Sequence, residues 1–274
     1  MRFDKGLKLI LLFLGLAVMS VQLIEAQMQT DLIVNGKRTP TKCVFRISNP
    51  KGLYNFSNYA CPSFSQNIER LSDTTVKITV TVSEFLPHPK QVLPVTNIPQ
   101  EIQKYLSPTK HIQSDSPEIT KIAKKINEST KSVTEAELVE SVLTWVRSNI
   151  KYGELNKEIT DALTVLNRKS SQCIGFAHLS TALLRNLGLP VRTVRTYALC
   201  SCGKNPPHFT RHSLIEIYYP YDNQWVLYDP QSPLSPSPAQ IYLYSDADWN
   251  QKKHDECKPF CLDPNTHIEV ITLE

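Results

Sequence analysis

The stretch "SSQCIGFAHLSTALLRNLGLP", residues 170–190, governs the interpretation of the rest of the chain. A serine at either of its first two positions can cap a helix, apolar side chains follow at helical spacing, and Gly188 with Pro190 ends the pattern. Cys173 therefore falls in the first turn of an amphipathic helix, where free N–H groups and the helix dipole lower a thiol pKa from about 8.5 toward neutrality. That position suits a reactive thiolate as well as it suits a small buried side chain, which free cysteines often are.

The first 26 residues have the layout of a secretory signal peptide. Three basic residues precede an apolar run from Leu9 to Val21, and a cleavage position follows Ala26. An uncleaved membrane anchor is the alternative, but a span needs about 20 apolar residues and this run is shorter. We therefore expect an exported protein, secreted or periplasmic, that meets an oxidising compartment and has no membrane contact beyond this segment.

The net charge and the length of the chain limit the kinds of partner and the number of domains that we expect. The formal net charge is +4, and lysines alternate with acids without a basic block, which argues against a nucleic-acid partner. After the signal segment, residues 27–100 form a small β-rich region that ends in a proline-rich linker, and residues 101–274 form the main domain. The oligomeric state stays open.

Seven cysteines, an odd count, leave at least one thiol unpaired in an exported protein. Cys173 stands apart, and the other six can pair among themselves. They are Cys43, Cys61, Cys200, Cys202, Cys257 and Cys261. A zinc site from the last four is the alternative, but its first spacing is tight for zinc and export favours disulfides. We expect no metal, and the pairing stays open.

Several elements can be predicted from local patterns. The runs at residues 41–47 and 74–86 read as strands, and the second alternates with period two. Residues 116–127 predict a helix that begins with a serine cap and a proline at its first position. A second helix starts at Thr134, which stands in capping-box spacing with Glu137.

Two strands after the cysteine helix carry further candidates. The run "RHSLIEIYY" contains His212, and a turn at "PYDNQ" leads into "WVLYDP", which contains Asp229. An antiparallel pairing of these strands would bring His212 and Asp229 together, which completes a Cys, His, Asp set. In such a set the imidazole moves the thiol proton and the carboxylate orients the ring. Taken singly, His212 could be an ordinary strand residue and Asp229 a turn residue; His208 is the competing histidine, but it lies among prolines.

Four blocks in fixed order carry a family resemblance. They are "TWVRSNIKY", "CIGFAHLSTALLRNLGLPVRTV", "HSLIEIYY" and "WVLYDP", within residues 117–231. This pattern resembles the transglutaminase-like superfamily of papain-type thiol enzymes, as an exported member of bacterial type. The resemblance implies an α+β fold with a papain-like core, in which the nucleophile helix packs on an antiparallel sheet beside the small N-terminal β region. It also implies Cys173 as nucleophile, His212 as general base and acid, and Asp229 as orienting carboxylate.

The implied chemistry is acyl transfer at an amide of a peptide or protein substrate, through a thioester. Capture by water, as in a cysteine peptidase or amidase, is favoured over cross-linking to a lysine amine, and a non-catalytic binding module of the same fold is the third alternative. His212 follows Cys173 by only 39 positions, which excludes a papain-family protease proper. The acidic residues are scattered rather than arranged as a calcium-binding loop, so no cofactor is expected.

One position departs from the resembled pattern. The family often has glycine two residues before the cysteine, where this chain has Ser171, and serine is restricted to negative φ there. The backbone N–H of Cys173 is expected to be one oxyanion donor, and the second donor cannot be assigned from the sequence.

Overall fold

Two larger antiparallel sheets and a group of helices make up most of the part of the chain that the structure describes. The computed structural model describes residues 33–34, 37–38, 41–49, 58–83, 85–89, 92–153, 160–200, 208–231, 242–247 and 266–273. The predicted signal segment, residues 1–26, lies outside this part of the chain. None of the helices that are described is long and apolar enough to cross a membrane.

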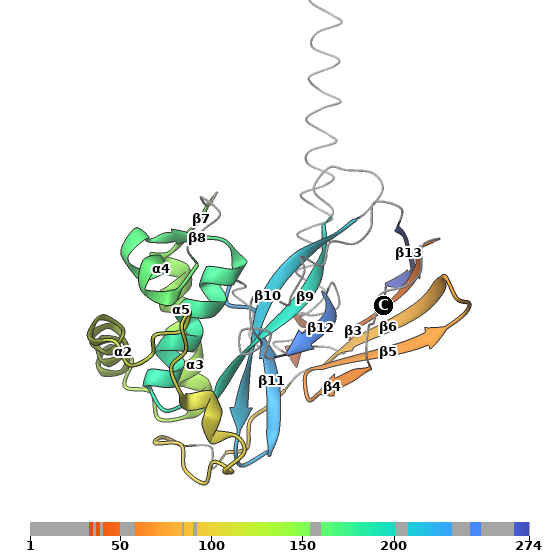
Figure 1. Cartoon of the computed structure of the whole chain (residues 1–274). Coiled ribbons are helices and arrows are strands. Elements are labelled where there is room, and N and C mark those ends of the chain that lie inside the picture. The colour runs from red at the N-terminus through yellow and green to blue at the C-terminus, as the bar shows by residue number, and fades with distance from the viewer. Residues whose placement is uncertain are drawn as a thin grey trace, which may run out of the picture.

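The helices lie in the chain between the N-terminal strands and the strands of the central sheet. Its helices are the 3₁₀ turn η1 (Gln103–Leu106), α2 (Pro117–Thr130), α3 (Glu135–Asn149), α4 (Ala162–Arg168) and α5 (Cys173–Asn186). A short parallel pair, β7 (Lys151–Tyr152) with β8 (Ser170–Ser171), leads into α5. Figure 1 shows these helices together on one side of the central sheet.

The central sheet has four antiparallel strands in the order β11, β10, β9, β12. They are β9 (Val191–Cys200), β10 (His208–Tyr219), β11 (Gln224–Tyr228) and β12 (Tyr242–Ala247). One face packs against the helices through side chains such as Ile215, Ile217 and Val226. The other face carries Leu214, Leu227 and Leu243, which pack against the second sheet. The central sheet is therefore buried on both faces, which holds the strands of the candidate site rigidly.

The second sheet has five strands in the order β13, β3, β6, β5, β4 (Figure 1). They are β3 (Thr41–Ser48), β4 (Tyr59–Cys61), β5 (Phe64–Arg70), β6 (Thr75–Val82) and β13 (His267–Leu273), and a separate pair joins β1 (Ile33–Val34) to β2 (Lys37–Arg38). Alternate residues of β6 are buried, as its period-two pattern predicts. β13 pairs with β3, so the last strand of the chain joins the sheet of the N-terminal region. The division into regions at residue 100 stays a prediction.

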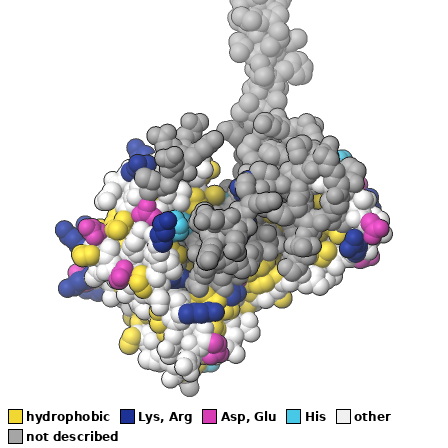
Figure 2. Space-filling model, viewed as in Figure 1, with side chains coloured by type: hydrophobic (Ala, Val, Ile, Leu, Met, Phe, Trp, Pro, Cys, Tyr) yellow, Lys and Arg dark blue, Asp and Glu magenta, His cyan; other side chains and the backbone are white. Residues whose placement is uncertain are grey.

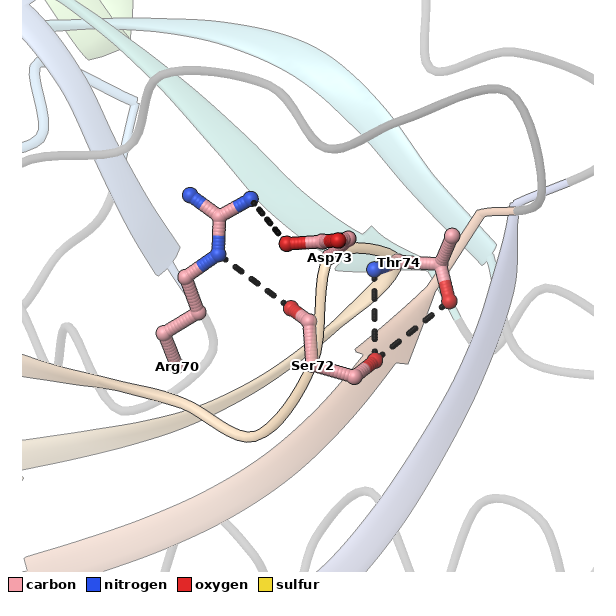
Figure 3. A network of polar contacts seen from close by, with 4 residues as sticks. All are labelled: Arg70, Ser72, Asp73 and Thr74. Atoms are coloured by element: carbon pink, nitrogen blue, oxygen red, sulfur yellow. Dashed lines mark hydrogen bonds and ion pairs between the residues drawn. The ribbon is translucent and has the colours of Figure 1, made fainter.

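The turn between β5 and β6 is closed by local polar contacts, which Figure 3 shows. Arg70 Nε donates to the carbonyl of Ser72 over 3.3 Å, and its Nη2 lies 3.4 Å from Asp73 Oδ1. The N–H of Thr74 donates to Ser72 Oγ over 3.2 Å. These side chains are exposed, so the ion pair contributes little to stability, and the contacts mainly set the course of the turn.

Local end signals account for the helix boundaries in α2 and α3. Ser116 Oγ accepts the N–H of Ile119 and Pro117 opens α2, as predicted. Thr134 and Glu137 form the predicted capping box at the start of α3. At α5 the predicted serine cap is wrong, because Ser170 and Ser171 are extended in β8 and Gln172 is the N-cap residue. The end of α5 is as predicted, since Gly188 has a φ of 86°, which favours glycine.

The expectation that six cysteines pair is wrong for two of them. Cys43 and Cys61 are free in the structure. They lie on β3 and β4, which are three strand spacings apart in the order β3, β6, β5, β4. That separation is roughly 14 Å, whereas a disulfide needs Cα atoms about 4.4–6.8 Å apart. The side chains of Cys200, Cys202, Cys257 and Cys261 lie outside the described residues.

Candidate active site

Cys173 is the first residue of α5, and its helix is anchored in the largest core. Most side chains of α5 are buried, among them Phe176, Leu179 and Leu183. They pack against α2, α3, α4 and the helix-facing side of the central sheet. Cys173 itself is partly exposed, and its thiol is free. The buried helix fixes the direction of the thiol, while the N-terminal end of the helix favours an anion there.

His212 and Asp229 come from adjacent strands and are hydrogen-bonded. His212 lies on β10, and Asp229 directly follows β11. The imidazole Nε2 lies 2.9 Å from Asp229 Oδ2. Asp229 Oδ1 accepts the N–H of Gln231 over 2.8 Å, which orients the carboxylate. Since Nε2 is occupied by Asp229, the ring nitrogen left for Cys173 is Nδ1.

Two neighbours on β10 alter the acidity of the Cys173 thiol. Burial alone raises the thiol pKa, but the hydrogen bond to His212 and its positive charge lower it, and hydrogen bonds from the backbone and side chain of Ser213 lower it further. The net pKa is below the ordinary thiol value. The sulfur is therefore biased toward the thiolate.

His212 is shifted in the complementary direction. Burial lowers the pKa of its imidazole, but the charges and hydrogen bonds of Asp229 and Cys173 together outweigh burial. The pKa of His212 rises to about 10. The two opposite pKa shifts favour a thiolate beside an imidazolium, which is the nucleophilic form of a Cys–His pair.

Ser213 is a site residue that the sequence reasoning missed. The alternation of the strand assigned it to the set opposite His212, although its hydroxyl and N–H reach the Cys173 sulfur. The only available signal was its position directly after His212. His208, the competing histidine, begins β10, but its side chain lies outside the described residues.

The surroundings suggest no metal-centred alternative within the described residues. There, no group of three or more His, Cys, Asp or Glu side chains could hold a metal ion. Charged side chains of both signs are scattered over the visible face in Figure 2 rather than gathered into one patch. Ser171 has an extended backbone in β8, so serine at this position is free of conformational strain.

Residues 120–230 match the model of the transglutaminase-like superfamily. This match covers 111 of the 274 residues, so the chain is similar to that superfamily over this range. The matched range contains Cys173, His212 and Asp229, and the fold is the α+β arrangement that the resemblance implied. No curated protein sequence matches the chain.

Solved structures with similar folds include three from different organisms. A protein of Cytophaga hutchinsonii, proposed to be a cysteine protease, is 18% identical with a TM-score of 0.47, covering 86% of this chain and 87% of that one. The periplasmic domain of TgpA from Pseudomonas aeruginosa is 14% identical with a TM-score of 0.42, covering 72% and 90%. Red sea bream transglutaminase is 12% identical with a TM-score of 0.37, covering 72% and 46%.

Proposed function

We propose that the protein is a thiol hydrolase that cleaves amide bonds of peptides or proteins through a thioester on Cys173. One observation carries the proposal: the sulfur of Cys173, at the start of α5, interacts with a His212 imidazole that is held 2.9 Å from Asp229. This arrangement supplies a nucleophile, a proton donor and an orienting carboxylate at one place.

The first half of the reaction uses the ion pair. The Cys173 thiolate attacks the amide carbonyl carbon, and the electron pair of the C=O bond moves to oxygen. The N–H of Cys173, at the positive end of α5, is the first oxyanion donor. The intermediate collapses as the C–N bond breaks, and the His212 imidazolium gives its proton to the leaving amine, which leaves a thioester and a neutral imidazole.

The second half regenerates the enzyme. Neutral His212 removes a proton from water, and the resulting hydroxide attacks the thioester carbonyl. The C–S bond then breaks, which releases the carboxylic acid and restores the thiolate beside the imidazolium. A primary amine in place of water would give a cross-link with the same residues, and the experiment below separates these outcomes.

The test is turnover by the purified protein. Casein and a fluorescent primary amine are incubated with wild type, Cys173→Ala, His212→Ala and Asp229→Asn, and mass spectrometry reads both new N-termini and incorporated amine. We expect new N-termini with wild type, and losses of about 10³-fold or more for the first two variants. Asp229→Asn should fold normally and still lose about 10²-fold or more, because its amide cannot stabilise the imidazolium.

Other outcomes decide against the proposal. Amine incorporation without new N-termini would identify a transglutaminase. Neither product, with no thioester trapped on Cys173, would identify a binding module. The proposal also keeps residues 1–26 as a signal peptide, which predicts that the protein released by cells begins at Gln27.

A further inference from the structure

The side chain of Ser171 covers the back of the first turn of α5 and fills the space beside Gly175. A Cβ atom placed on Gly175 would lie 1.9 Å from Ser171 Oγ and 2.7 Å from Ser171 Cβ. The same atom would lie 2.7 Å from Cγ2 of Val165 on α4. Atoms do not approach so closely, so the serine side chain occupies the volume that any other residue at position 175 would need.

This contact lies on the opposite side of the helix from the nucleophile. Residues of an α-helix advance by about 100° each, so positions 173 and 175 point about 200° apart. Gly175 therefore turns its open side toward Ser171, while Cys173 points toward His212 and Ser213. The first turn is held between Ser171 behind and the two strand residues in front.

Ser171 is itself held firmly. It pairs with Tyr152 in the parallel β7–β8 ladder, and its carbonyl accepts the N–H of Gly153 over 3.2 Å. Its side chain is fully buried, and its hydroxyl has no hydrogen-bond partner among the described residues. Within the described residues, the Ser171 side chain therefore contributes by filling space beside Gly175 rather than by hydrogen bonding. Only Gln172 separates Ser171 from Cys173, so this volume is coupled directly to the start of the helix.

We infer that Ser171 is a positioning residue, whose side chain fits over Gly175 and sets the distance of Cys173 from His212. The inference rests on the proposed function, because it concerns the reactivity of Cys173. A smaller residue at 171 lets the first turn retreat from the imidazole, and a larger residue at 175 drives the turn against the strands and out of its alignment with the imidazole. Either change weakens the ion pair and raises the thiol pKa toward the ordinary value.

The test measures the rate of Cys173 alkylation by iodoacetamide between pH 4 and 9, with thermal unfolding followed in parallel. Ser171→Gly should remain folded, label about tenfold more slowly at pH 6, and shift its labelling midpoint upward, because small misplacements of a reacting group are costly. Gly175→Ala should lose at least as much. The double variant S171G/G175A should recover most of that loss, since the new methyl group replaces the serine side chain. Adding Val165→Ala removes the remaining contact at 2.7 Å.

The matched control is Ser180→Ala. Ser180 is also fully buried on α5, and its hydroxyl has no hydrogen-bond partner in the described part of the chain, but it lies about two turns beyond Cys173. Its variant should label like wild type.

Two results would overturn the inference. One is a folded Ser171→Gly with the labelling rate and pH profile of wild type. The other is a folded double variant that labels no faster than Gly175→Ala. If Gly175→Ala does not fold, recovery of folding in the double variant supports the fit between the two residues, and Ser171→Gly alone decides its effect on the thiol.

Failure of the proposed function gives a different pattern. In that case wild-type Cys173 itself has an ordinary labelling profile and no amide is turned over. Non-additive thermal stability of the two single changes would still support the packing of Ser171 over Gly175, and additive effects would overturn it.

Discussion

The Cys173 thiol and the His212 imidazole titrate as a coupled pair, and their shifts point in opposite directions. The thiol pKa is lowered and the imidazolium pKa is raised to about 10. The ion pair therefore exists between the two pKa values. Below the lower value the sulfur is protonated, and above about 10 His212 loses the proton that a leaving amine requires.

This coupling predicts different pH profiles for two measurements. Amide hydrolysis should fall on both sides, with an alkaline limb near pH 10, because it needs thiolate and imidazolium together. Alkylation of Cys173 needs only the thiolate, so it should persist through the alkaline limb. A common alkaline decline in both measurements would contradict this assignment of His212. The internal control is Cys43, whose pKa is raised by burial to about 12, so that it should stay unlabelled in the folded protein.

Substitution of Ser213 should change only the acid side of the pH profile of Cys173 alkylation. Ser213→Ala removes the side-chain hydrogen bond that helps to lower the Cys173 pKa, while the backbone N–H of residue 213 remains. The labelling rate below neutral pH should fall severalfold and the acid midpoint should move upward. The alkaline limb of hydrolysis should stay where Asp229 sets it. An unchanged acid midpoint would remove Ser213 from the site.

At the scale of elements, α3 depends on its capping box. Thr134 Oγ1 accepts the N–H of Glu137 over 3.3 Å, and Glu137 Oε2 accepts the N–H groups of Thr134 and Val133 over 3.0 and 2.8 Å. The backbone hydrogen bonds from Val133 and Thr134 lower the pKa of the Glu137 carboxyl. α3 in turn packs Val139, Val142 and Val146 into the core that supports α5.

Removing the cap should therefore cost stability without changing the site. Thr134→Ala should lower the free energy of unfolding by about 1 kcal/mol at pH 7, measured by urea denaturation. Since the Glu137 pKa is lowered on folding, its contribution is present above the unfolded value and is lost as pH falls through the folded value, and Glu137→Gln should weaken that dependence. The control is the exposed Ser148→Ala in the same helix, which should change stability by less than about 0.5 kcal/mol. A Thr134→Ala variant as stable as this control would contradict the role of the cap.

At the scale of the whole molecule, one side chain joins the two sheets by forming hydrogen bonds with the backbone of an edge strand. The Gln66 amide, on β5, donates to the carbonyl of Tyr244 over 3.0 Å and accepts its N–H over 2.9 Å. Tyr244 lies on β12, an edge strand of the central sheet, and its ring stacks on that of Tyr59 at 3.6 Å. Gln66 is buried, so these hydrogen bonds are shielded from water. This contact ties the N-terminal sheet to the sheet that carries His212.

Loss of this contact should lower the stability of the whole molecule. Gln66→Leu removes two buried hydrogen bonds to the backbone of Tyr244, and should lower the free energy of unfolding by about 2–4 kcal/mol. The measurement is thermal unfolding together with limited proteolysis, and the control is Asn67→Ala, whose side chain is exposed on the same strand. Equal stability of the two variants would show that the sheets are held by apolar packing alone. We expect Cys173 labelling to decline only at temperatures where the sheets separate.

Much of the fold was predictable because it depends on residues that are close in sequence. The ends of α2 and α3 are set by caps within four residues, and the stop of α5 by a glycine that adopts positive φ. The alternation of β6 and the short turn between β10 and β11 are equally local, and that turn brings His212 beside Asp229. The order of the four blocks then sufficed to predict which family model residues 120–230 match.

Only the tertiary structure decided the contacts that join distant parts of the chain. The strand order places Cys43 and Cys61 too far apart to pair and puts β13 beside β3, more than 200 residues away in sequence. Ser170 and Ser171 were expected to cap α5, but pairing with β7 makes them extended. The reach of Ser213 to Cys173 and the fit of Ser171 over Gly175 depend on how a helix docks on strands and neighbouring helices. Such packing is decided by the shapes and hydrogen bonds of surfaces that meet only after folding, so periodicity along the chain carries no signal for it.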